Sequence, residues 1–221
     1  MQNPIDSLLY VQISAEQAGK IFEHLESSIP LPIQLSEPNQ KEDFTAENIE
    51  PEMILAGMLT VFAYDRENPN IAYYRKIFNL LRPDIRKEMT QAAIIKIKNN
   101  DFGMAEEILL SLEGLNPDDG ITKLNLALLM EERSQFCEMR ELFDDALSFN
   151  KRAEELYSEL ILFEPPLPAA FFNAAYFFIK QKTEPLVLRS SVFISIKLKS
   201  LSLYKINYNL LFEQVFYHQL S

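Results

Sequence analysis

The feature that most constrains the fold is a stretch of 44 residues, Ile121 to Glu164, that contains neither glycine nor proline. This stretch is rich in Leu, Glu, Ala and Lys/Arg, which have high helix propensity. All five glycines of the chain lie in its first 120 residues. Glycine and proline are the two strongest helix breakers, and neither interrupts the stretch. The sequence therefore predicts long helix here.

Before and after this stretch, apolar-rich runs alternate with short breaks that contain Pro, Asn or Asp. Asp84 and Asp119 each precede a predicted helix, and we expect their side chains to accept hydrogen bonds from its free N–H groups. Short breaks of this kind join antiparallel neighbours, so the sequence predicts an all-α fold. The predicted helices cover residues 54–65, 71–81, 85–99, 102–115, 121–133 and 169–182. The rest of the long stretch, after residue 133, is also predicted to be helical.

The first 50 residues have a different character. Residues 15–28 predict a short amphipathic helix, in which Ser14 and Gln17 are spaced as a capping box. Residues 29–51 carry four prolines, a density that interrupts helix and sheet alike, so a linker or an extended strap is expected. The expected organisation is an N-terminal helix and linker over 1–50, a helical domain over 51–182 and an atypical segment over 183–221.

Composition argues against several classes of function. The chain has 21 Lys+Arg against 32 Asp+Glu, a net charge of −11, which disfavours sequence-independent binding to nucleic acid. A single cysteine, Cys137, excludes an internal disulfide framework and a metal site built on paired thiolates. Two histidines far apart, His24 and His218, leave little for a zinc site or a Ser-His triad. Cys137 is expected to be a structural thiol inside a helix.

The motifs of nucleotide-binding loops, serine hydrolases and zinc proteases are also missing from the sequence. We therefore expect no catalytic residue, no metal and no cofactor. The N-terminus lacks the features of a signal peptide, and no uncharged apolar run reaches the roughly 18 residues of a membrane span. A cytoplasmic protein without a membrane span is expected.

The prolines that end the predicted helices reveal a repeat. Pro83 and Pro117 are 34 residues apart, and Pro117 and Pro165 are 48 apart, which is 34 plus an insertion of 14. Small residues recur at fixed places before these prolines, where they let two helices approach closely, and large apolar residues follow them. The matching positions are Ala92-Ala93, Leu126-Ala127 and Ala174-Ala175 in the first helices, Ala105 with Leu109 and Leu112, Ala153 with Tyr157 and Leu160 in the second, and the turn Asn100-Asp101-Phe102.

This pattern resembles the tetratricopeptide repeat family over residues 84–182, and covers 51–83 poorly. The resemblance implies a right-handed superhelical array of about three to four antiparallel helix pairs. It also implies a non-catalytic scaffold that binds a peptide or partner helix in a concave groove lined by the first helices. The insertion between Arg133 and Ala146 would lengthen one helix pair or add a turn. The alternative is a helical bundle of another kind with coincident prolines.

Amide side chains precede the small pair of each first helix, at Gln91, Asn125 and Asn173. An amide can donate to and accept from one extended peptide unit, so these residues suit peptide binding; the alternative is a tolerated polar residue on a hydrated face. The cationic clamp that chaperone-binding members of the family use is absent, so binding to chaperone C-termini is not expected. Neighbours expected to share the groove are Thr90, Ile94, Leu124, Leu128, Phe172 and Tyr176.

Residues 183–221 lack Gly, Ala and Asp, and carry four Lys/Arg against two acids. They could supply a missing final helix, form a hairpin or a disordered extension, or be an aberrant end such as a reading-frame change would produce. In the last two cases the aromatic residues of the preceding helix would lose cover and invite self-association; these are Phe171, Phe172, Tyr176, Phe177 and Phe178. An accessory subunit that uses this aromatic end as a permanent interface is therefore the alternative function.

Overall fold

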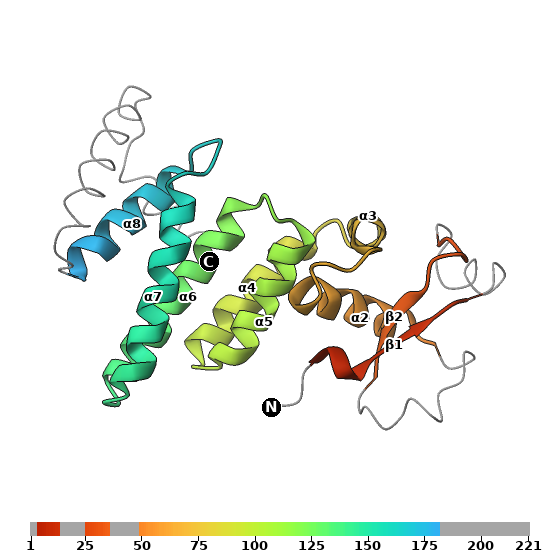
Figure 1. The fold of residues 1–221 in the computed structure, drawn as a ribbon, viewed down its shortest axis with the longest axis horizontal. Coiled ribbons are helices and arrows are strands. Elements are labelled where there is room, and N and C mark those ends of the chain that lie inside the picture. The colour runs from red at the N-terminus through yellow and green to blue at the C-terminus, as the bar shows by residue number, and fades with distance from the viewer. Residues whose placement is uncertain (1–3, 14–24, 36–48, 182–221) are drawn as a thin grey trace. The chain divides into compact units, whose positions relative to one another are not determined.

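A computed structural model describes residues 4–13, 25–35 and 49–181. The described part is mostly helical, which confirms the prediction at that level (Figure 1). The chain divides into two compact units, 1–119 and 120–221, where the sequence predicts one helical domain over 51–182. Most of the expected helix 15–28 and the segment 183–221 lie outside the described residues. Residues 25–28 are described and end in a turn instead of a helix, in which the N–H of Ile29 donates to the carbonyl of Glu26.

The described residues of the first unit form four α-helices, whose bounds agree with the predicted ones to within a few residues. Pro51 occupies the first turn of the first of them, where its missing N–H costs no hydrogen bond. The four helices are α2 (Pro51–Tyr64), α3 (Ile71–Leu81), α4 (Ile85–Lys98) and α5 (Phe102–Leu115).

A two-stranded antiparallel sheet in this unit is a correction to the sequence analysis. After the short 3-10 helix η1 (Pro4–Ser7), strand β1 (Leu8–Val11) pairs with β2 (Leu31–Gln34). The segment 29–51 was expected to be a linker, because prolines interrupt sheets. Pro32 is nevertheless tolerated within β2, because each strand of a two-stranded sheet has an edge that needs no N–H donor.

Helix α2 packs between β2 on one side and α5 on the other (Figure 1). Two glycines make this possible. A Cβ at Gly57 would overlap the backbone of Pro32, and a Cβ at Gly114 would overlap the carbonyl of Phe62. Helix α5 also packs on α4, so the unit is a stack of the strand pair, α2, α5 and α4. Its core is apolar, and Phe62 and Phe78 meet edge to face at 5.6 Å within it.

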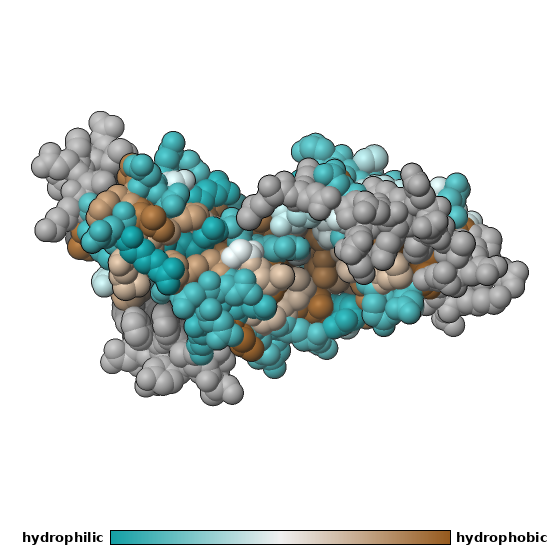
Figure 2. Space-filling view, turned by 90° about the horizontal axis from the view of Figure 1, so that it is seen from below, coloured by the Kyte–Doolittle hydropathy of each residue, from teal (hydrophilic) through white to brown (hydrophobic). Residues whose placement is uncertain are grey.

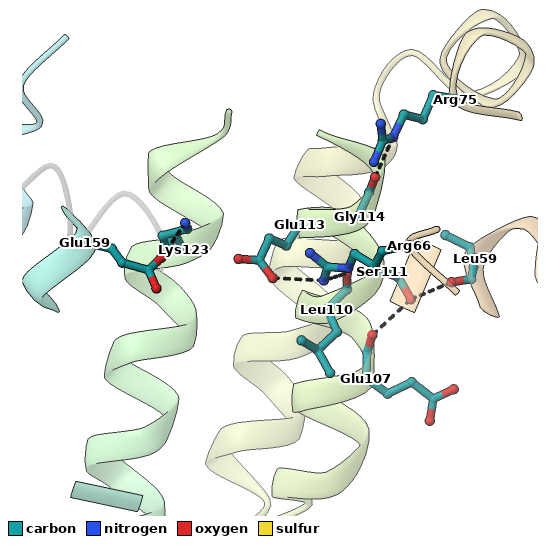
Figure 3. Close-up of polar contacts among 10 residues, drawn as sticks. All are labelled: Leu59, Arg66, Arg75, Glu107, Leu110, Ser111, Glu113, Gly114, Lys123 and Glu159. Atoms are coloured by element: carbon teal, nitrogen blue, oxygen red, sulfur yellow. Dashed lines mark hydrogen bonds and ion pairs between the residues drawn. The ribbon is translucent and has the colours of Figure 1, made fainter. Parts of the chain in front are cut away.

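Arginines hold the C-terminal end of α5 (Figure 3). Arg75 Nε donates to the carbonyl of Gly114 at 2.7 Å. Arg66 donates to the carbonyl of Leu110 at 3.1 Å and to the Glu113 carboxylate at 2.9 Å. Cations stabilise this end of a helix because its last carbonyls lack partners within the helix and carry the negative end of the helix dipole.

The second unit contains α6 (Gly120–Glu138), α7 (Phe143–Leu160) and α8 (Pro168–Lys180). With 19 and 18 residues, α6 and α7 are longer than α4 and α5, which have 14 each. The insertion that the sequence analysis placed between Arg133 and Ala146 thus lengthens a helix pair. Lys123 and Glu159 form an ion pair between α6 and α7 at 2.7 Å (Figure 3).

The turns α4–α5 and α6–α7 have the same backbone geometry. Asn100 and Glu141 are the two non-glycine residues with positive φ, 59° and 62°, in the part of the chain that the structure describes. After each, an N–H bonds back to a carbonyl five residues earlier, Asp101 to Lys96 at 2.9 Å and Leu142 to Cys137 at 3.0 Å. These bonds define the Schellman motif that ends helices.

This equivalence locates the insertion. The turn residue lies 17 residues after Pro83 in one pair and 24 after Pro117 in the other, and the next proline follows at 17 and 24 residues. Seven residues are therefore added on each side of the turn in the second pair, and α6 and α7 are longer than α4 and α5 by five and four of them. Seven residues correspond to about two helical turns.

The expected N-caps need one correction. Asp84 precedes α4 but makes no side-chain cap bond, because its ψ of 3° differs from the extended backbone of a cap. The carboxylate of Asp119 pairs with Arg86 at 2.7 Å. Asp101, in the predicted turn, is a cap and accepts a hydrogen bond from the N–H of Met104 at 3.4 Å. The hydrogen bond from Lys96 lowers the pKa of Asp101.

Candidate functional site

In the second unit the two expected first helices, α6 and α8, run in the same general direction. Near the start of α6, the Phe163 ring and the Leu167 side chain lie 3.1 Å and 3.6 Å from where a Cβ of Gly120 would be. Further along α6, Glu131 is close enough to Lys180, at the end of α8, for its charge to affect the Glu131 pKa. Helix α7 packs against both α6 and α8, and the rings of Tyr157 and Phe177 lie 5.1 Å apart.

One row of α6 side chains reaches the surface. Ile121 and Glu132 are exposed, and Asn125 and Leu128 between them are half-buried. These residues are three or four apart, so they follow one face of the helix. We call Ile121, Asn125 and Leu128 the α6 row. Leu124 was expected on the same surface, but it is only 3% exposed and belongs to the core.

The side-chain amide of Asn125 is the least satisfied polar group of this unit. Its Nδ2 is buried, and no hydrogen-bond partner for it exists within residues 4–13, 25–35 and 49–181. Leaving a buried donor unpaired costs about 1–3 kcal/mol. Such a group needs an explanation, and a ligand that accepts its hydrogen bond is one.

A second exposed row follows α8. Phe172, Tyr176 and Ile179, which we call the α8 row, are between 46% and 66% exposed. Asn173 beside them is half-buried, and its Nδ2 donates to the carbonyl of Ala169 at 2.8 Å. The other three aromatic residues of the helix do not lack cover, since Phe171, Phe177 and Phe178 are buried in the core.

The remaining expected groove residues lie on α4, in the other compact unit. Gln91 is exposed, and Thr90 and Ile94 are half-buried. The structure thus places the expected site residues of the second unit on α6 and on α8, which both pack against α7. Ile121 and Ile179 were missed by the sequence analysis, although extending each row by one more helical turn would have found them.

A buried polar pair was also missed. The Tyr157 hydroxyl donates to the Glu131 carboxylate between α7 and α6. Burial raises the pKa of Glu131, partly offset by this hydrogen bond and by Lys180. Burial and then the charge of Glu131 raise the pKa of Tyr157. The sequence pattern identified Tyr157 only as a large residue that fills the helix interface, since nothing in it pairs this hydroxyl with a carboxylate.

The α6 row and the α8 row offer apolar side chains and an amide. On the face seen in Figure 2, hydrophobic residues come to the surface in separate places between hydrophilic ones. In the described ranges, no three His, Cys, Asp or Glu residues are grouped so that they could hold a metal ion. Nor is any described helix both long and apolar enough to cross a membrane. Cys137 is buried.

Apolar rows with a buried amide donor can bind a ligand through apolar contacts and through a hydrogen bond to an acceptor on it, such as a peptide carbonyl. Comparison of the chain with protein-family models, with curated proteins and with solved structures finds no match.

Proposed function

We propose that this chain is a non-catalytic protein–protein interaction scaffold, built from tetratricopeptide-like helix pairs, that binds a peptide or partner helix. The binding surface comprises the α6 row and the α8 row on the first helices of the second unit. The observation that carries the proposal is the buried, unpaired Nδ2 of Asn125. In the complex the side chain of Asn125, a half-buried residue, turns outward so that Nδ2 donates to a backbone carbonyl of the ligand.

The flanking residues suit such a ligand. Ile121 and Leu128 lie one turn to each side of Asn125, and together with the exposed α8 row they provide apolar contact area. Exposed apolar side chains of this size that follow one helix face are typical of partner binding. The net charge of −11 favours a basic ligand.

Three observations support the repeat frame within this proposal. The α4–α5 and α6–α7 turns share one Schellman geometry. The insertion divides equally, with seven residues on each side of the α6–α7 turn, a spacing of about two helical turns. The small residues at the expected helix crossings, Ala105 and Ala153, are both fully buried, as expected where two helices approach closely.

The test is capture of partners from the native cell lysate, identified by mass spectrometry. Wild type is compared with the double variant Asn125→Ala/Asn173→Ala. Asn99→Ala, an exposed amide in the α4–α5 turn, is the matched control. A partner that binds wild type and the control but not the double variant supports the proposal. A partner retained by all three proteins contradicts it.

The exposed α8 row also supports a second function, a permanent interface of an accessory subunit. In that case the three apolar residues of the row are covered in a stable assembly. The mass of the purified chain in solution, from gel filtration with light scattering, separates the two functions. A monomer supports a ligand surface. A stable oligomer that Phe172→Ser/Tyr176→Ser converts to a monomer supports the permanent interface.

A further inference from the structure

The α6–α7 hairpin has an end that the proposed binding rows do not use. Helices α6 and α7 are five and four residues longer than α4 and α5, so the pair extends by a little more than one turn beyond the length of the α4–α5 pair. The extension ends in the Schellman turn at Glu141. It is therefore a helical hairpin end, and its surface can be considered by itself.

Small residues hold the two helices of this end together. Ser134 and Ala146 are buried, and the Ser134 hydroxyl donates to the carbonyl of Ala146 at 3.0 Å. Cys137, three residues after Ser134 in the sequence, is also buried. A contact made by small side chains lets the helix backbones approach closely. It also leaves no room between them for large side chains, which must therefore point outward.

Four large apolar residues of this end are exposed. They are exposed by 48% to 77% and fall within nine residues, which makes this the densest run of exposed large apolar side chains among the described residues. Single exposed apolar residues are ordinary, but such a group marks an interaction surface. We call Met139, Leu142, Phe143 and Leu147 the hairpin-end patch.

The charges around the patch indicate what it binds. Four exposed acids lie within or beside the patch in the sequence, against two exposed cations, Arg140 and Lys151, and the guanidinium of Arg140 lies over the Phe136 ring at 3.9 Å. This acidic rim repels an anionic lipid surface and an identical end of a second copy. It attracts a cation. The four acids are Glu138, Glu141, Asp144 and Asp145.

We propose that the hairpin-end patch docks a cationic amphipathic helix of a partner protein. The apolar face of that helix covers Phe143 and Leu147, which lie one turn apart on α7, together with Met139 and Leu142. Its Lys and Arg side chains pair with the acidic rim. This contact is independent of the α6 and α8 rows, so it stands whether or not they bind a peptide.

The test measures binding of a labelled amphipathic helical peptide of leucine and lysine to the full chain by fluorescence anisotropy at low salt. Replacing lysine by glutamate in the same peptide gives the charge control. Two variants change the patch, Phe143→Ser/Leu147→Ser for its apolar part and Asp144→Asn/Asp145→Asn for its rim. Circular dichroism verifies that each variant keeps its helix content.

Two matched variants separate this surface from the rest of the protein. Leu80→Ser/Ile95→Ser removes two exposed apolar side chains from α3 and α4. Asp84→Asn/Asp118→Asn removes the same two charges at exposed positions of the first unit. These controls are needed because a protein with a net charge of −11 attracts any cation.

The proposal expects the lysine peptide to bind wild type and both controls, and to bind each patch variant about tenfold more weakly. It expects the glutamate peptide not to bind. Equal affinity for patch variants and controls would overturn the proposal, as would equal binding of the two peptides or no binding to wild type. Loss of binding in Leu80→Ser/Ile95→Ser alone would also overturn it.

Discussion

Glu141 occupies in the α6–α7 turn the left-handed conformation that Asn100 occupies in the α4–α5 turn, with φ of 62° and 59°. Asn tolerates this conformation because its side chain bonds locally, whereas Glu has no such compensation. A geometry that two dissimilar residues adopt at equivalent places reflects the way each helix pair closes. The two helix pairs share the backbone conformation of the turn, and not the type of residue at its left-handed position.

Replacing Glu141 by glycine relieves this strain. We expect Glu141→Gly to raise the free energy of unfolding by about 1 kcal/mol, because glycine reaches positive φ without a Cβ clash. Denaturant unfolding measures the change. Asn100→Gly is the control and should gain less. A loss of stability in Glu141→Gly would show that the glutamate side chain stabilises the turn.

Gly114 and Gly103 offer a matched pair on α5. A Cβ at Gly114 overlaps the Phe62 carbonyl, whereas nothing lies within 4 Å of a Cβ at Gly103. We expect Gly114→Ala to lower the free energy of unfolding by roughly 3 kcal/mol, as α2 and α5 are forced apart. Gly103→Ala should raise it by about 0.5 kcal/mol, through helix propensity. Thermal melting distinguishes the signs, and equal effects would refute the close approach of α5 to α2.

Overpacking tests the helix crossings of the repeat frame. Ala105 and Ala153 are fully buried at equivalent places in α5 and α7. We expect Ala105→Leu and Ala153→Leu each to cost about 1–3 kcal/mol of stability, because a leucine cannot fit without displacing the neighbouring helix. Met104→Leu, at an exposed position of α5, is the control. Unchanged melting of both alanine variants would contradict the repeat frame.

Glu131 makes the stability depend on pH. Its pKa is raised in the folded chain by burial, so its contribution is fully present below the pKa of the unfolded chain and is lost as pH rises through the folded-state pKa. Glu131→Gln stays neutral and can still accept the Tyr157 hydroxyl. We therefore expect this variant to be more stable than wild type at neutral pH, with the difference shrinking toward pH 4. Unfolding midpoints across this pH range measure it, and a difference that grows on acidification contradicts the burial of the carboxyl.

Asn125 links stability and function with opposite signs. If its Nδ2 is unpaired in the free protein, Asn125→Leu removes a desolvation cost of about 1–3 kcal/mol and should stabilise the free chain. Asn173→Leu instead removes a donor that is paired with the Ala169 carbonyl and should not stabilise. Denaturant unfolding compares the two. A clear loss of stability in Asn125→Leu would show that the amide is already satisfied.

The sequence predicted the helices well, because each is bounded by Pro, Asn or Asp and its apolar residues repeat at helical spacing. It failed at β2, where the proline count hid a strand whose Leu31, Pro32 and Ile33 are all buried. Helix α2 packs on that strand, with the close backbone approach at Gly57, and such a contact between distant segments leaves no local pattern.

For the candidate site, the repeat spacing placed Asn125, Phe172 and Tyr176 on helices, and the structure has them on α6 and α8. It wrongly placed Leu124 on the surface, because adjacent residues of a helix point in different directions. One of them can face the surface while the next faces the core. It also missed the Tyr157–Glu131 hydrogen bond, which depends on how α6 and α7 cross. Spacing predicts which element carries a residue, and packing decides which way the residue faces.

The most direct test of the central claim is a calorimetric titration with one peptide, selected from a displayed library against wild type. Wild type and Asn125→Leu are titrated in parallel, with Asn99→Ala as control. The account predicts that Asn125→Leu binds at least about tenfold more weakly while melting no lower than wild type, because a hydrogen bond to the ligand is lost and a buried unpaired donor is removed. Equal affinity of wild type and Asn125→Leu for the peptide would contradict a binding surface centred on Asn125.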